Sequence, residues 1–309
     1  MNYAFQDNVG SFMSLVSFVK TEDHDLKRAI ADALRLINYD FRKDVKRIVI
    51  KPNMCYYWDR STGQTTDPKL IGALIDVIRD NISADPVISI VESDASAMKC
   101  KHAFRFLGYE KLARDCNVRL VNLSEDTYDR VKVTSGGISF HLMVPRTIQC
   151  ADLKINVPKI KYSLEKIKIT CALKNVFGCN PYRKKSRYHS KLNEAIVAVN
   201  KAMRFDLAVI DGNIVSGSEP RRLGLVMASM DQVAIDAAAA RVAGVNPGTV
   251  KYIQLAEKER LGKMTFIQTG LSVGHFQARY PRKTLYKKLM DKAYGTVVLM
   301  RLGKRLGLE

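Results

Sequence analysis

The sequence lacks the signatures of several common protein classes. Its cysteines, at positions 55, 100, 116, 150, 171 and 179, include no pair separated by two residues. This spacing excludes a zinc ribbon or an iron–sulfur cluster built from local sequence, and it favours reduced cysteines over disulfides. No segment approaches the ~20 apolar residues of a membrane span. The first basic residue is Lys20, which argues against a signal peptide. We therefore expect a cytoplasmic protein.

Acidic residues are scarce relative to basic ones. The chain of 309 residues has 50 Lys and Arg but 31 Asp and Glu, a formal net charge of +19. Such a charge points to anionic partners, namely phosphorylated metabolites, nucleic acid or an acidic membrane surface. The apolar fraction of 47% and the charged fraction of 26% are ordinary for a soluble globular protein. No internal repeat or low-complexity segment is present.

Strands and helices alternate along the chain. Apolar runs predict strands at 12–20, 45–50, 87–91, 118–123, 207–210, 223–228 and 264–268, and amphipathic periodicity predicts helices at 23–37, 67–79, 99–115, 192–203, 231–243 and 250–261. The segment 131–144, interrupted by Ser135-Gly136-Gly137, predicts a β-hairpin. This pattern predicts an α/β fold: a mostly parallel central sheet flanked by helices, with a hairpin insertion and a basic C-terminal helical tail. We expect α/β lobes at 1–150 and 151–278 and the tail at 279–309.

The stretch 152–191 carries the densest chemistry. It holds eleven Lys or Arg and one internal acid, Glu165. Functional groups gather at the carboxyl ends of parallel strands, where lysines meet an anion and backbone N–H groups supply further donors. The predicted substrate-binding residues, which form an anion cradle around four lysines, are Lys51, Asn53, Thr66, Lys159, Lys161 and Asn175, with Lys174 as the fourth lysine. For the basic cluster 183–187, a solvated face is the favoured interpretation.

Three residues are candidates for proton transfer. Lys174 has apolar neighbours, and partial burial would lower its pKa and make it a base or an imine-forming amine; the alternative is a lysine that reaches solvent from a helix. His189 can relay a proton near neutral pH or simply begin a helix. Asp211, followed by Gly212, can act as a base, orient His189, ligate a metal or form a turn. Cys55 has no adjacent base in sequence, so an inert thiol is favoured there.

Two acidic residues follow the strand predicted at 87–91. Glu92 and Asp94 are spaced i, i+2, and carboxylates so spaced can bind one divalent cation when the chain turns. The alternative is that Asp94 caps the next helix. A divalent metal is therefore the one cofactor that the residues themselves suggest.

A series of short motifs supports a family resemblance. In order they are Lys51-Pro52-Asn53, Thr65-Thr66-Asp67-Pro68, Glu92-Ser93-Asp94, Asn156 to Lys161, Ala172 to Gly178, Asp211-Gly212 and Ala228 to Asp236. The series, over roughly residues 16–270, resembles the domain of unknown function 362 family, whose name leaves activity open. Many members carry an iron–sulfur module, for which this chain lacks the cysteines. Members often continue the lysine motif with Thr-His, where this chain has Tyr162-Ser163, which leaves His189 as the main histidine candidate.

Two functional hypotheses remain. In the first, a cytoplasmic enzyme holds a small phosphorylated or carboxylated substrate with the clustered lysines, and His189 and Asp211 transfer protons; transferase, lyase and isomerase chemistry are not separated. In the second, a non-catalytic polyanion-binding protein docks on nucleic acid or an acidic membrane. The segment 279–305 has nine basic residues against Asp291 and interspersed apolar residues, which suits a peripheral membrane position better than base recognition. An enzyme core with this basic appendage is the preferred combination.

Overall fold

The computed structural model describes most of the chain. The described residues are 5–6, 12–22, 25–54, 56–83, 85–95, 98–163 and 167–282. Cys55 lies outside these ranges, and so do residues 283–309, which make up the greater part of the predicted basic tail. Within the described ranges, no helix combines the length and the apolar character needed to cross a bilayer.

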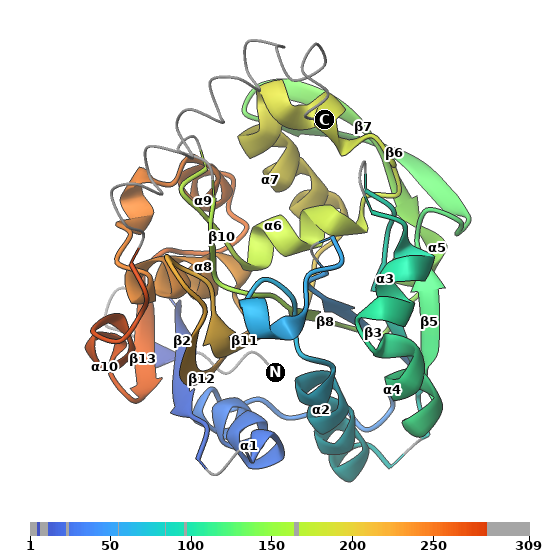
Figure 1. The fold of residues 1–309 in the computed structure, drawn as a ribbon. Coiled ribbons are helices and arrows are strands. Elements are labelled where there is room, and N and C mark those ends of the chain that lie inside the picture. Colours follow the sequence, from blue (N-terminus) through green and yellow to red (C-terminus); the bar gives the residue numbers. More distant parts are fainter. Residues whose placement is uncertain are drawn as a thin grey trace.

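A nine-stranded sheet forms the centre of the molecule (Figure 1). In spatial order its strands are β1 (Phe5–Gln6), β2 (Phe12–Lys20), β12 (Arg221–Ser229), β11 (Leu207–Val215), β8 (Leu153–Val157), β3 (Arg47–Pro52), β4 (Val87–Glu92) and β5 (Arg119–Asn122), and β13 (Phe266–Gly270) also pairs with β2. Neighbours pair in parallel except at β1–β2, β2–β12 and β12–β11. The predicted α/β fold with a mostly parallel sheet is confirmed.

Helices cover both faces of this sheet (Figure 1). One face carries α1 (Leu26–Leu36), α2 (Pro68–Asn81), α3 (Cys100–Phe106) and α4 (Tyr109–Asp115); the other carries α6 (Ala172–Val176), α7 (Leu192–Ala202), α8 (Gln232–Val242) and α9 (Lys251–Lys258). Two short helices, α5 (Arg146–Gln149) and α10 (Val273–Gln277), complete the α-helices of the described ranges. Helix α2 begins as its sequence predicts, because the Asp67 side chain accepts a hydrogen bond from Lys69 N at 2.9 Å and Pro68 takes the first helical position.

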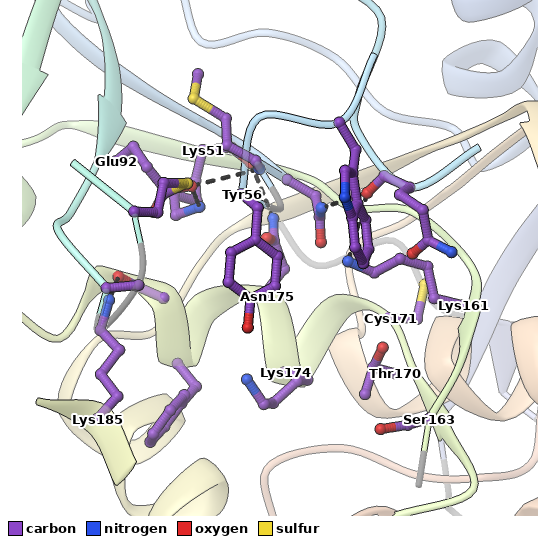
Figure 2. Close-up of a pocket in the computed structure, with 18 of the residues that line it drawn as sticks. Lys51, Tyr56, Glu92, Lys161, Ser163, Thr170, Cys171, Lys174, Asn175 and Lys185 are labelled. Carbon is purple, nitrogen blue, oxygen red and sulfur yellow. Dashed lines mark hydrogen bonds and ion pairs between the residues drawn. The ribbon is translucent and has the colours of Figure 1, made fainter. Parts of the chain in front are cut away.

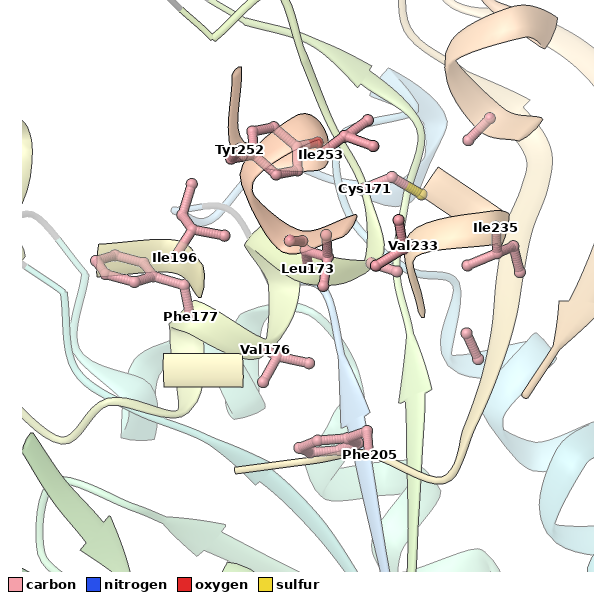
Figure 3. Packing of buried hydrophobic residues seen from close by; sticks show 14 of the residues in the cluster. Cys171, Leu173, Val176, Phe177, Ile196, Phe205, Val233, Ile235, Tyr252 and Ile253 are labelled. Atoms are coloured by element: carbon pink, nitrogen blue, oxygen red, sulfur yellow. The ribbon is translucent and has the colours of Figure 1, made fainter. Parts of the chain in front are cut away.

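Alternate residues of each central strand enter different hydrophobic clusters. In β3, Ile48 and Ile50 pack with the α1–α4 cluster, whereas Val49 packs with the cluster that contains α6 to α9. Successive strand side chains point to opposite faces, so a buried strand must be apolar on both. Figure 3 shows part of the second cluster, where Leu173 and Val176 of α6 lie among residues of α7, α8 and α9.

The lobes predicted at 1–150 and 151–278 share this architecture. Strands β12, β11 and β8 of the second segment lie between β2 and β3 of the first in the one sheet, and residues of both segments enter each cluster. The described structure therefore joins the two segments through a common core.

The predicted hairpin is present as a separate two-stranded sheet, formed by β6 (Tyr128–Ser135) and β7 (Ile138–Pro145). Its two-residue turn, Gly136-Gly137, has φ values of +56° and +75°. Positive φ at both central turn residues matches the right-handed twist of hairpin strands, and glycine adopts it without steric cost.

Two predicted elements differ from the structure. The helix predicted at 99–115 is divided into α3 and α4 at Gly108, whose φ is +82°. The strand predicted to end at Ile210 continues as β11 to Val215, because its second half pairs with β12 in a hairpin. Asp211 therefore lies inside a strand, opposite Val226.

The loop after β3 is fixed against the end of β11 through Gly63. A Cβ atom at Gly63 would lie 2.4 Å from Val215 C, and the φ of Gly63 is +70°. Gly63→Ala should destabilise the fold by about 1–3 kcal/mol more than Gly137→Ala. Both substitutions place alanine at positive φ, but a Cβ at Gly137 meets nothing within 4 Å. Urea unfolding of both variants measures the difference, and equal losses would contradict the close approach.

Candidate functional site

A pocket of about 520 Å³ lies at the carboxyl ends of β3 and β4 (Figure 2). Helix α6 forms one wall, and the loop after β3 and the small β9 (Lys161–Tyr162) and β10 (Ile169–Thr170) sheet form others. Of the described residues that line the pocket, four are lysines and one is acidic: Lys51, Lys161, Lys174, Lys185 and Glu92. Clustered lysines in a concave site at strand ends provide the charge to bind an anion.

A buried ion pair forms the floor of this pocket. Lys51 Nζ lies 2.7 Å from Glu92 Oε2, and both side chains are almost fully buried. Lys51 Nζ also donates to Pro52 O at 2.7 Å, and Glu92 Oε1 accepts from Ser93 N at 2.9 Å. Buried charges of this kind are stable only when they are paired and hydrogen bonded, as here. Because the two charges offset each other, the net charge of the pocket comes from the other three lysines.

Those three lysines reach the pocket from different elements. Figure 2 shows Lys174 on α6, with Lys185 on one side of the view and Lys161 on the other. Lys174 Nζ lies 4.6 Å from the centroid of the Phe177 ring, a cation–π contact that favours the charged amine. Lys161 Nζ lies 3.4 Å from Gln64 O, so it is held only loosely by that contact.

Lys185 is the residue that the sequence interpretation missed. Its Nζ donates to Ser93 Oγ at 2.5 Å and to Asp94 O and Gly178 O, each at 3.1 Å. Burial lowers the pKa of Lys185 to about 8, against the stabilising charge of Glu92. The residue begins η3 (Lys185–Lys191), and its neighbour Lys184 is exposed. A solvated face, the interpretation favoured for cluster 183–187, thus fails for this one residue.

Helix α6 is anchored by buried polar groups from three other elements, α8, β3 and β8. Asp236 of α8 accepts hydrogen bonds from Ala172 N at 2.5 Å and Leu173 N at 3.2 Å, the first N–H groups of α6. Burial raises the pKa of Asp236 to about 7. On the opposite side, Asn175 Nδ2 donates to Lys51 O at 3.1 Å and to Asn156 Oδ1 at 2.8 Å. These bonds fix the helix that presents Lys174, and a motif ending in Asp236 was the only sequence signal for this role.

Lys159 and Asp211 form a second buried ion pair that does not line the pocket. Lys159 Nζ lies 3.1 Å from Asp211 Oδ1 and donates to Ile214 O at 2.6 Å. Asp211 also accepts from Asp67 N at 2.9 Å, which ties β11 to the start of α2. Burial lowers the pKa of Lys159 despite the attraction of Asp211. Thr66, which donates to Val157 O at 2.9 Å, is likewise buried beside the pocket and not in it.

The remaining predicted residues divide in the same way. Asn53 and Asn175 line the pocket together with Lys51, Lys161, Lys174 and Glu92. His189 lies in η3, is exposed and does not line the pocket. The two proton-transfer candidates His189 and Asp211 therefore lie outside the pocket, whereas Lys174 lines it.

The carboxylates predicted to hold a metal are engaged by protein groups. Glu92 pairs with Lys51, and Asp94 pairs with Arg183 at 3.1 Å and accepts from Cys100 N, at the start of α3, at 2.9 Å. Among the described residues, no group of three His, Cys, Asp or Glu side chains could hold a metal ion. These residues do not fit a divalent cation, and Asp94 fills the alternative role of supporting a helix N-terminus.

The fold and the site define an α/β protein with a lysine-lined pocket at the carboxyl edge of a mostly parallel sheet. The chain belongs to the family described as Domain of unknown function (DUF362), whose model matches residues 48–241. The chain is 25% identical over 265 residues to Thylakoid-associated protein sll1697 of Synechocystis sp., covering 80% of this chain and 79% of that protein.

Among solved structures, the lactate racemase apoprotein from Thermoanaerobacterium thermosaccharolyticum aligns with a TM-score of 0.43 and 11% identity. The alignment covers 75% of this chain and 57% of the racemase chain.

The Lys159–Asp211 pair should act on stability. Lys159→Met leaves the Asp211 carboxylate buried without its cation, so the free energy of unfolding should fall by about 3–5 kcal/mol. Lys154→Met is the matched control, because Lys154 pairs with the more exposed Asp206 at 3.7 Å and its loss should cost less than about 1 kcal/mol. Chemical denaturation of both variants checks this, and similar small losses would contradict the structural role.

Proposed function

We propose that the protein is an enzyme that binds a small anionic substrate in the lysine-lined pocket. The observation that carries the proposal is the convergence of Lys161, Lys174 and Lys185 on a concave site whose one lining carboxylate, Glu92, is neutralised by Lys51. Three ammonium groups in a partly enclosed space attract an anion more strongly than the same groups in open water. A volume of about 520 Å³ suits a small metabolite.

The type of cation favours a phosphorylated substrate over a carboxylated one. The positively charged groups that line the pocket are lysines, with no arginine among the described lining residues. A guanidinium group matches a planar carboxylate through two parallel hydrogen bonds, whereas ammonium groups act as point charges that suit a tetrahedral phosphate from several directions. Lysines at three positions around the pocket fit that second mode.

Lys185 is the candidate for proton transfer in this proposal. A base must be partly unprotonated near neutral pH, and the pKa of about 8 gives Lys185 that property, whereas the cation–π contact of Lys174 favours its charged form. Ser93 Oγ, which accepts a hydrogen bond from Lys185, orients the amine. In this scheme Lys161 and Lys174 hold the anion while Lys185 exchanges a proton with the substrate.

Substitution of the pocket lysines tests anion binding. Lys174→Met and Lys161→Met should each weaken the binding of inorganic phosphate by about 10- to 100-fold, because a hydrogen bond to a charged group contributes about 1.5–3 kcal/mol. Lys184→Met is the matched control: it removes an exposed lysine that does not line the pocket. Isothermal titration calorimetry gives the affinities. Equal, small losses in all three variants would indicate diffuse polyanion attraction in place of a defined site.

The pH dependence of anion binding should report Lys185. Below its pKa of about 8 the amine is charged and attracts an anion, and it loses this charge as the pH rises through that value. The affinity for sulfate, whose own charge is constant, should therefore begin to fall near pH 8, whereas ordinary lysines titrate at about 10.4. Lys185→Met should lack this step. A wild-type affinity that stays constant up to about pH 10 would contradict the assignment.

A further inference from the structure

Two exposed aromatic rings stand at the mouth of the pocket. Tyr56 and Trp58 line it, yet each is 47% exposed, and their ring centroids lie 5.3 Å apart. Figure 2 shows the Tyr56 ring extending from the loop after β3 over α6. Large aromatic rings that remain half exposed beside a pocket indicate a ligand-binding surface, because exposing them to water costs free energy that burial against a ligand would recover.

The loop that carries these rings is held in place by its own contacts. Asn53 Nδ2 donates to Gln64 O at 2.9 Å, and Gly63 lies against the end of β11. Between the two pocket rings, Tyr57 turns away: its hydroxyl accepts from Lys99 N at 2.9 Å and its ring packs against Phe106. Tyr56 itself has a φ of +53°, a conformation that is uncommon for a bulky residue and is often found at ligand sites.

Trp58 also separates the lysine pocket from a second cavity. This neighbouring cavity, of about 260 Å³, is lined by Trp58 and Gln64, which it shares with the lysine pocket, and by the loop residues 216–218. The indole therefore lies at the junction of a cationic site and an uncharged one. An elongated ligand can place its anion among the lysines and its body along the indole.

We infer that the substrate carries a planar ring beside its phosphate, as a nucleoside monophosphate does, and that Trp58 and Tyr56 stack on this ring. The inference rests on the proposed function, because the lysines supply the anion site. Aromatic side chains that stack on a heterocycle next to lysines that bind its phosphate are a general means of recognising such ligands. Tyr57, packed on Phe106, takes no part.

The sole tryptophan of the chain makes this inference directly measurable, since all tryptophan fluorescence comes from Trp58. Adenosine monophosphate should quench it, whereas ribose phosphate should bind without comparable quenching. By calorimetry, adenosine monophosphate should bind about tenfold more tightly than ribose phosphate, in line with the usual effect of base stacking. Adenosine, which lacks the anion, should bind more weakly than adenosine monophosphate. Lys174→Met should lower the affinity for both adenosine monophosphate and ribose phosphate.

Variants then separate stacking from anion binding. Trp58→Leu should abolish the preference for the monophosphate over ribose phosphate while leaving ribose phosphate affinity unchanged; Trp58→Phe, which keeps a ring, should retain most of it. Tyr57→Leu is the matched control and should keep the full preference. If ribose phosphate binds through the lysines as tightly as the monophosphate, or if the preference survives Trp58→Leu, the ring inference fails and the anion site stands. If neither phosphate ligand binds, both fail.

Discussion

The ion pair between Lys51 and Glu92 is the interaction on which the site depends. It joins the carboxyl ends of two neighbouring parallel strands, β3 and β4, and it is almost fully buried under the pocket. Gly178, in the short helix η2 (Phe177–Cys179) that follows α6, approaches so closely that a Cβ there would lie 3.3 Å from Lys51 Nζ. Loss of either partner would leave a buried charge without compensation, which is why one pair constrains the sheet edge and α6 together.

A chain of polar groups extends from this pair into the core. Lys51 O accepts from Asn175, Asn175 bonds to Asn156, and Asn156 Nδ2 donates to Gln232 Oε1 at 2.8 Å. The bonds thus link β3, α6, β8 and α8. Buried networks of this kind fix side-chain positions more strictly than apolar packing does, although Gln232 Nε2 has no partner among the described groups. The network fixes α6, the helix that carries Lys174, relative to Lys51 on β3.

The sequence predicted the sheet and most of its helices, and six of its eleven candidate site residues line the pocket. Residues at strand ends and at the start of a helix fall at the edge where parallel strands converge. This pattern made it possible to predict Lys51, Asn53, Lys174 and Asn175 from the sequence. Lys185 could not be predicted in this way, because its exposed neighbours give a pattern typical of a solvated surface and only the path of η3 turns its amine inward.

Lys159 shows the opposite error in sequence reasoning. Lys159 lies just after β8, much as Lys51 lies near the end of β3, so the sequence placed both at the same edge of the sheet. The antiparallel hairpin of β11 and β12, however, continues beyond the parallel strands and brings Asp211 to Lys159. The apolar pattern of β11 alone does not indicate how far such a hairpin extends, because its length is decided by cross-strand pairing with β12.

The strand order has a consequence for how the chain acquires its shape during synthesis. The early strand β2 has its long-range partners in β12 and β13. Ser14, for example, pairs with Phe266, so this side of the sheet cannot form until residue 266 has been synthesised. The nascent chain therefore emerges from the ribosome before the partners of β2 have been synthesised. Pairing between segments so distant in sequence slows folding and exposes folding intermediates to aggregation.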